Sequence, residues 1–91
     1  MSIQVRIPTV LRKHTGDQAT VQASGTTLAQ VIDDIDARHP GFRAAVVSED
    51  GALHRFINVY VNDEDVRFLE SLQTPLKDGD TVSVLPAVAG G

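Results

Sequence analysis

The chain ends in Gly90 and Gly91, and these two residues are the part of the sequence best placed to do chemistry. Glycine has no Cβ, so such a backbone can enter a narrow channel and adopt angles closed to other residues. The Gly91 carboxylate could attack the α-phosphate of ATP in a partner enzyme, and a sulfur nucleophile could then displace AMP. The product would be a terminal thiocarboxylate, a tethered sulfur donor. Chain ends are often simply frayed, so the dipeptide alone leaves this open.

The segment before the glycines has the properties of an arm. Pro86 should end the last strand, because its ring nitrogen cannot donate to a sheet. The five residues after it can extend at most about 17 Å, which exceeds the radius of gyration of roughly 12 Å expected for this chain length. We therefore expect residues 1–86 to form one domain and residues 87–91 to form a flexible tail. The tail residues expected to thread into a partner are Val88, Ala89, Gly90 and Gly91.

Composition removes several function classes. The chain has 91 residues, no cysteine and a net charge of −4, so disulfides, thiolate nucleophiles and cysteine-bound metals are excluded. The acidic balance argues against nucleic-acid binding and suits a partner with a basic docking surface. No apolar stretch approaches the length of a membrane span, and the first ten residues do not resemble a signal peptide. We expect a cytoplasmic protein with no membrane association.

Hydrophobic periodicity predicts the elements that carry the tail. Alternation of apolar and polar residues indicates strands over residues 3–8, 19–23, 56–61, 66–68 and 82–85. Helical spacing of Leu28, Val31, Ile32 and Ile35 predicts an amphipathic helix, with Thr27 and Gln30 in capping-box spacing and Thr26 as a competing cap. A short second helix is expected over residues 42–47. The order strand, strand, helix, strand, short strand, strand predicts an α+β fold, a β-grasp mixed sheet with one main helix across it.

Three side chains are expected outside the core. Phe56, Tyr60 and Leu85 alternate away from the core face and could form an exposed docking patch near the tail, unless a loop or the 69–76 segment covers them. The histidines at 14, 39 and 54 lack ligand-like spacing, and the acidic run 63–65 is typical of a solvated turn. We predict no catalytic residue, no metal site and no bound cofactor.

Three blocks of the sequence resemble a known family. The segment 76–82 and the ending Leu85-Pro86-Ala87-Val88-Ala89-Gly90-Gly91 are similar to the ThiS and MoaD ubiquitin-like sulfur carriers. Together with these, the blocks 7–12 and 54–68 most closely resemble CysO-type carriers of cysteine biosynthesis. The stretches 48–53 and 70–74 carry little of the resemblance.

The resemblance implies a β-grasp fold and a set of partners. An adenylyltransferase of the ubiquitin-activating type (MoeB/ThiF-like), using ATP and magnesium, would activate Gly91 for sulfur loading. A cysteine synthase that uses pyridoxal phosphate would accept the sulfur, and a metal-dependent peptidase would release the new cysteine. The alternatives are a sulfur donor for thiamin, molybdopterin or a thiosugar natural product, a protein modifier conjugated through Gly91, and an interaction module with an idle tail.

Overall fold

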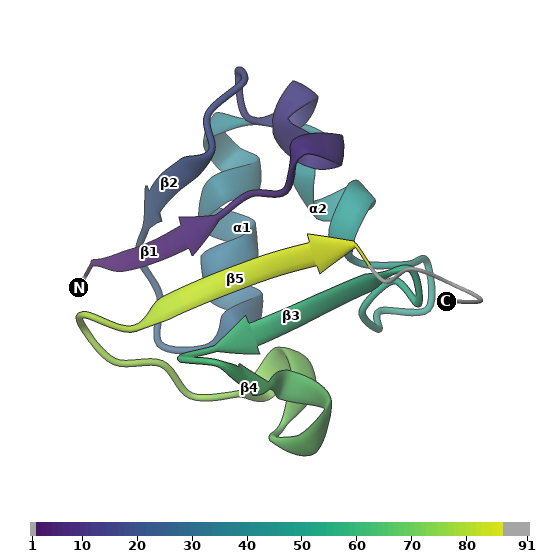
Figure 1. The fold of residues 1–91 in the computed structure, drawn as a ribbon. Coiled ribbons are helices and arrows are strands. Elements are labelled where there is room, and N and C mark those ends of the chain that lie inside the picture. The colour runs from purple at the N-terminus through teal and green to yellow at the C-terminus, as the bar shows by residue number, and fades with distance from the viewer. Residues whose placement is uncertain (1, 87–91) are drawn as a thin grey trace.

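Five strands form one mixed sheet in the order β2-β1-β5-β3-β4 (Figure 1). The structure is a computed structural model that describes residues 2–86. The strands are β1 (Ile3–Arg6), β2 (Thr20–Ala23), β3 (Ile57–Val61), β4 (Glu64–Asp65) and β5 (Thr81–Pro86). β1 and β5 are parallel neighbours, and the other three pairs are antiparallel. The last strand therefore lies at the centre of the sheet, beside the first.

One main helix covers one face of the sheet. α1 (Leu28–Arg38) lies across that face, and the short helix α2 (Phe42–Val46) follows it (Figure 1). Three short 3-10 helices complete the fold: η1 (Thr9–His14), η2 (Val66–Phe68) and η3 (Ser71–Gln73). This architecture confirms the predicted β-grasp fold.

The N-terminus of α1 is capped as its sequence predicts, with one change of partner. The Thr27 hydroxyl accepts a hydrogen bond from the Gln30 N–H at 3.3 Å. The Gln30 side chain does not return to Thr27; its Oε1 accepts from the backbone N–H of Thr26 at 2.8 Å and from the Thr26 hydroxyl at 2.9 Å. Both threonines therefore take part in the hydrogen bonds that end the loop and cap the start of the helix.

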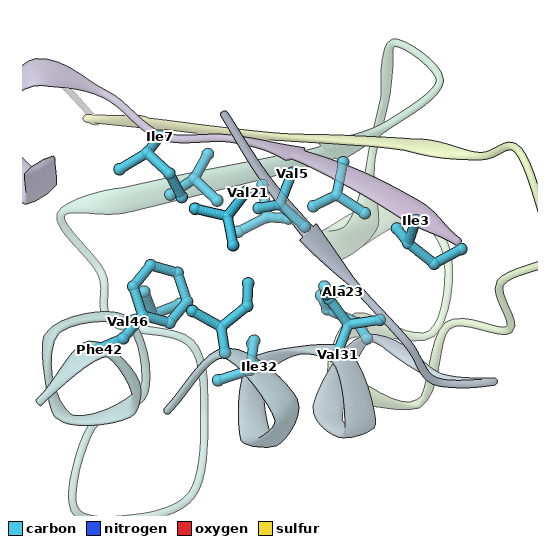
Figure 2. Close-up of a cluster of buried hydrophobic side chains, with 14 of the residues drawn as sticks. Ile3, Val5, Ile7, Val21, Ala23, Val31, Ile32, Phe42 and Val46 are labelled. Atoms are coloured by element: carbon cyan, nitrogen blue, oxygen red, sulfur yellow. The ribbon is translucent and has the colours of Figure 1, made fainter. Parts of the chain in front are cut away.

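The core lies between the sheet and the two helices. The predicted apolar face of α1 is buried, as are the inward residues of β1, β3 and β5. Figure 2 shows labelled side chains of β1, β2 and α1 gathered in one cluster with Phe42 and Val46 of α2. Phe42 is the largest of the fully buried side chains, so it carries the greatest apolar area of any residue in this core.

Two local predictions are wrong. The return strand predicted over 66–68 is instead β4 at residues 64–65, and residues 66–68 form η2. Asn62 and Asp63 both have positive φ, of 50° and 74°, so they make a two-residue hairpin turn and pairing must begin at Glu64. The Asp65 carboxylate then accepts from the Arg67 N–H at 2.9 Å and starts the 3-10 turn. The other omission is η1, which occupies much of the segment between the first two predicted strands.

A four-residue connection joins β2 tightly to α1. A Cβ added at Gly25 would lie 2.8 Å from the Cβ of Gln30 and 2.9 Å from the backbone nitrogen of Val31. Only glycine allows the loop to approach the first turn of α1 this closely.

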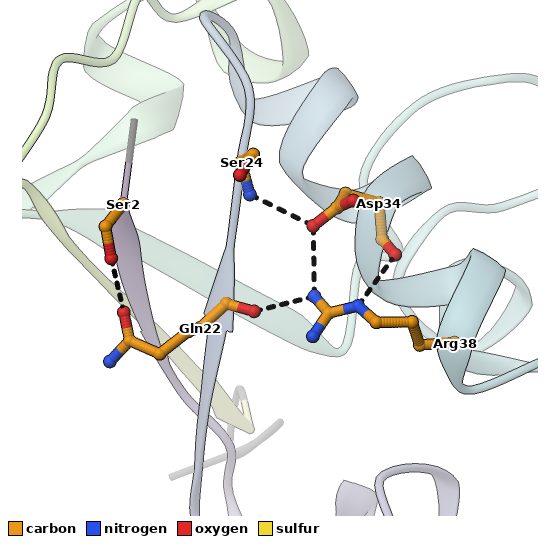
Figure 3. A network of polar contacts seen from close by, with 5 residues as sticks. All are labelled: Ser2, Gln22, Ser24, Asp34 and Arg38. Carbon is orange, nitrogen blue, oxygen red and sulfur yellow. Dashed lines mark hydrogen bonds and ion pairs between the residues drawn. The ribbon is translucent and has the colours of Figure 1, made fainter.

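Polar contacts hold the far end of α1 against β2 (Figure 3). The Asp34 carboxylate accepts from the Ser24 N–H at 3.0 Å and pairs with Arg38 at 3.0 Å. Arg38 also donates to the Gln22 carbonyl at 2.6 Å. The Gln22 side chain in turn accepts from the Ser2 hydroxyl at 2.7 Å.

The turn before β5 is organised around Asp80. Its carboxylate accepts from the Lys77 N–H at 2.9 Å and from the Asn62 side chain at 3.0 Å. These two hydrogen bonds, the one from Lys77 first, lower the pKa of Asp80 from its ordinary value. Asn62 also accepts from the Thr81 N–H at 3.0 Å, so the turn is tied to both β3 and β5.

Candidate functional site

The predicted sulfur-bearing residue, Gly91, lies outside the described residues, as do Val88, Ala89 and Gly90. What the structure does describe is the strand from which they continue. β5 runs between β1 and β3, and its last residue, Pro86, is paired with Ile57 at the start of β3. The candidate site is therefore the end of the sheet at which β5 stops, which we call the root of the tail.

Tyr60 of β3 and Leu85 of β5 lie on the sheet face opposite α1, and Phe56 lies in the turn just before β3. Phe56 is 46% exposed and Leu85 is 45% exposed. Leu85 is paired with Asn58, two residues after Phe56, so both apolar side chains lie at the root of the tail. Tyr60 is half-buried and is paired with Ser83, further from the end of β5. The root thus presents Phe56 and Leu85 to solvent, with Tyr60 behind them.

Two arginines are held beside this apolar patch. The Arg55 guanidinium carbon lies 5.0 Å from the centre of the Phe56 ring, a cation–π contact. Arg67, from η2, donates to the Asn58 side chain and to the Ile57 carbonyl, both at 2.7 Å. Because Ile57 is the partner of Pro86, the Arg67 guanidinium is anchored at the root of the tail.

Two more arginines lie on the other side of β5. Arg6 and Arg12 line a hollow of about 510 Å³ together with Leu85 and Pro86. Arg12 is fixed there by a hydrogen bond of 3.1 Å from its Nε to the Ile7 carbonyl. Arg6 is the last residue of β1, the parallel neighbour of β5, and it is exposed. Basic side chains therefore lie on both sides of the strand that leads to the tail.

Residues 2–86 hold no group of side chains suited to a metal ion. Over that range, no three His, Cys, Asp or Glu side chains are grouped closely enough to hold a metal ion. The three histidines lie in different parts of the fold, on η1, at the end of α1 and before β3. No helix in the described part of the chain has the length and apolar character needed to cross a membrane.

Sequence reasoning missed several exposed residues. Phe68, assigned to a strand, is 88% exposed at the end of η2, and Val10 is 59% exposed on η1. It also missed the arginines at the root of the tail. Positions 6, 12, 55 and 67 are scattered along the chain, and only the pairing of β5 with β1 and β3 brings them to one end of the sheet.

Comparison with known proteins gives a consistent picture over the whole chain. Sulfur carrier protein CysO of Mycobacterium tuberculosis is 55% identical, and the match covers 100% of both chains. CysO in the crystal structure of the Amycolatopsis orientalis BexX/CysO complex is 57% identical, with a TM-score of 0.91 over 98% of this chain and 99% of that one. Small archaeal modifier protein 3 of Haloferax volcanii is 31% identical over 100% of both chains.

These relatives are named as carriers or modifiers and not as enzymes. The model of the ThiS family matches residues 5–91, which include both terminal glycines. The chain therefore belongs to the ThiS family.

Proposed function

We propose that this chain is a sulfur carrier whose working group is the Gly91 carboxylate and whose sulfur serves cysteine biosynthesis. The observation that carries the proposal is the full-length identity of 55% to a protein named as the sulfur carrier CysO. The absence of cysteine supports it, because a carrier without a thiol must hold sulfur elsewhere. The terminal carboxylate is the group that can do so.

The proposed chemistry has two steps in a partner enzyme. A Gly91 carboxylate oxygen attacks the α-phosphorus of ATP, and the bond to pyrophosphate breaks to leave an acyl-adenylate. A sulfur nucleophile then attacks the acyl carbon, and AMP leaves with the bonding electron pair. The enzyme binds ATP and magnesium, and the sulfur nucleophile is at the oxidation level of sulfide, so the products of the second step are a Gly91 thiocarboxylate and AMP. The carrier supplies a carboxylate at the end of a chain that continues from the central strand β5.

Partner enzymes would recognise the domain at the root of the tail. Phe56 and Leu85 are the apolar side chains exposed beside the end of β5, with Tyr60 behind them. A partner whose channel opens next to this patch would bury apolar area and take up the tail in the same event. The proposed partners are an adenylyltransferase of the ubiquitin-activating type, a sulfur-accepting cysteine synthase that uses pyridoxal phosphate, and a metal-dependent peptidase that releases the cysteine. A CysO has been crystallised with a protein partner, BexX, which supports assembly of this kind.

The test is an intact-mass measurement. The full chain is incubated with a candidate activating enzyme, ATP, magnesium and a sulfide source. The expected product is heavier by the difference between sulfur and oxygen, and fragmentation places the change at Gly91. Two variants act as controls: deletion of Gly91, and addition of one alanine after Gly91, which keeps every residue but moves the carboxylate. Loading should be lost in the deletion variant and sharply reduced in the extended one, with thermal unfolding unchanged in both. Loading that persists without Gly91 would refute the proposal.

A second candidate function is protein modification, favoured by the 31% identity to a small archaeal modifier protein. The same activated Gly91 would then form an isopeptide bond with a lysine amine of a target protein, again releasing AMP. Mass spectrometry of trypsin-digested cell extracts for lysines bearing residues 78–91, the fragment that remains after cleavage at Lys77, separates the two functions. Conjugates that disappear when Gly91 is deleted would favour the modifier, and their absence would favour the carrier.

A further inference from the structure

The charge at the root of the tail is opposite in sign to the charge of the chain. The molecule carries a net charge of −4 and eight Lys and Arg residues in total. Four of the eight lie around the end of β5; we call Arg6, Arg12, Arg55 and Arg67 the arginine group. The net charge alone suggests a basic partner, but half of the basic side chains of the protein gather beside the root of the tail. The acidic side chains that line a hollow with one of them, Arg55, are those of Asp36, Glu49 and Asp50.

The arginine group is not neutralised by the domain. The ion pairs within residues 2–86 are Arg38 with Asp34 and Arg43 with Asp33. Both of these arginines belong to the helical layer of the fold, α1 and α2. The four arginines at the root have no carboxylate partner in the described part of the chain, so their charges remain available to another molecule.

Three of the four guanidinium groups are nevertheless held in place. Arg67 is fixed by the Ile57 carbonyl and the Asn58 side chain, and Arg12 by the Ile7 carbonyl. Arg55 is held over the Phe56 ring. Neutral acceptors and an aromatic face orient these groups without cancelling their charge, so a carboxylate on a partner meets donors that have already lost much of their side-chain freedom.

Stability alone does not explain the arrangement. Like charges gathered on one surface repel one another and oppose compact folding. At the root they surround two exposed apolar residues, Phe56 and Leu85. An apolar centre with arginines around it is the composition of a protein-binding surface, in which charged groups at the rim set the approach of the partner.

From this arrangement we infer that the arginine group is an electrostatic docking rim for an acidic protein surface. The partner carries aspartates and glutamates around the mouth of the channel that receives the tail, and an apolar contact for Phe56 and Leu85. This inference deepens the proposed function, on which it rests, by giving the chemistry of the partner surface. The rim acts mainly on the rate and orientation of encounter, and the apolar contact acts on the lifetime of the complex.

The first experiment uses a probe that does not depend on sulfur chemistry. The isotope-labelled full chain is titrated with a synthetic glutamate-rich peptide that contains one leucine, and the backbone amide shifts are mapped by NMR. Shifts should gather around Arg6, Arg55, Phe56 and Leu85 and shrink at high salt. A response spread evenly over the surface, or none, would overturn the inference. A single-stranded oligonucleotide is titrated in parallel, and tighter binding of that probe at the same residues would overturn the choice of a protein partner.

The second experiment measures association with the activating enzyme that loads the wild-type chain. Arg6→Glu and Arg55→Glu are compared with Lys77→Glu, which makes the same change of charge in the turn before β5. Arg6 and Arg55 are chosen because neither side chain makes a hydrogen bond within residues 2–86, so the backbone pairing of the fold should tolerate both changes. Each should lower the association rate about three-fold to ten-fold at low ionic strength, with little effect in high salt. Lys77→Glu should change it by less than about two-fold.

The outcomes separate the two proposals. If the wild-type chain is loaded with sulfur but both arginine variants associate as fast as Lys77→Glu, the inference of a docking rim is refuted. The proposed carrier function is then unaffected. If no loading occurs while the acidic peptide maps to the arginine group, the rim stands and the carrier function falls. The unfolding curve of Arg6→Gln should match or exceed the wild-type stability, because a repelling charge is removed. Arg55→Gln also loses the cation–π contact with Phe56, so its unfolding curve should lie slightly below that of the wild type.

Discussion

The contact between Gly25 and α1 makes a sharp prediction about stability. In Gly25→Ala, the new Cβ would lie 2.8 Å from the Gln30 Cβ and 2.9 Å from the Val31 nitrogen. Both atoms belong to the backbone or lie next to it, so neither can rotate away and the connection itself must shift. Overpacking of this kind typically costs about 1–3 kcal/mol.

A smaller effect opposes this cost. Replacing glycine by alanine restricts the unfolded chain, which stabilises the folded state by about 0.4–1 kcal/mol. The overpacking term is larger, so we expect a net loss of about 1–2 kcal/mol. For a domain of this size, that loss lowers the melting temperature by roughly 5–15 °C.

Urea unfolding followed by far-ultraviolet circular dichroism is the appropriate assay, because the chain has no tryptophan and a single tyrosine. The midpoint should fall with little change in the slope m, because the unfolded surface is nearly the same.

Gly51 supplies the control. It has a φ of +81° and nothing within 4 Å of an added Cβ. Gly51→Ala should lower the free energy of unfolding, because alanine is strained in this backbone region. Asparagine tolerates the region, so Gly51→Asn should recover most of the free energy of unfolding that Gly51→Ala loses. Gly25→Asn should recover nothing, because it carries the same Cβ. Stability of Gly25→Ala within about 0.5 kcal/mol of the wild type would refute this account of the β2–α1 connection.

Two further perturbations test the core and the turn before β5. Phe42→Ala empties the largest fully buried position and should cost about 3–5 kcal/mol in the urea midpoint analysis; a loss below about 1 kcal/mol would mean that α2 is not packed as described. Asp80→Asn tests the lowered pKa of Asp80, whose stabilising effect is present above the ordinary value of 3.8 and disappears as the pH falls through the folded-state pKa. The variant should therefore be less stable than the wild type at neutral pH, and the difference in stability should shrink in acid. Melting curves of the two proteins measured in parallel check this. A difference in stability that stays constant with pH would contradict it.

Much of the fold could be predicted because local signals agreed with the tertiary structure. Thr27 and Gln30 stand where a helix must start, and the apolar residues that follow recur at the spacing that buries one face. Val59 lies in a run that alternates strictly, and it is fully buried in β3. In such segments the same residues satisfy both the local pattern and the core, so the sequence can be interpreted without knowing the partner elements.

The predictions failed where a turn set the register. The residues of η2 resemble those of a strand. The positive φ angles of Asn62 and Asp63, however, make a turn so tight that pairing with β3 already begins at Glu64. Asp65 then ends the strand by capping η2. Propensity within residues 66–68 carried no information about either event, because both are decided by the residues that precede them.

The cluster of positive charge around the root of the tail could not be predicted from the sequence, for a different reason. Arg6 and Arg55 are 49 positions apart, and neither has a neighbour that marks it as part of a surface. Their common location depends on β5 pairing with β1 on one side and β3 on the other. Predicting it would require the complete sheet order together with the position of each side chain on its strand.

The pair formed by Asp34 and Arg38 also bears on how the protein behaves at high concentration. β2 is an edge strand, and unpaired edges offer N–H and C=O groups to strands of other molecules. Here the Gln22 carbonyl and the Ser24 N–H are already bonded to those two side chains. A second copy that added its own strand at β2 would first have to break both hydrogen bonds. The charged side chains of Asp34 and Arg38 would then lose these backbone partners. The helix thus protects this edge of the sheet against strand addition by a second copy, so the chain is expected to remain monomeric at high concentration.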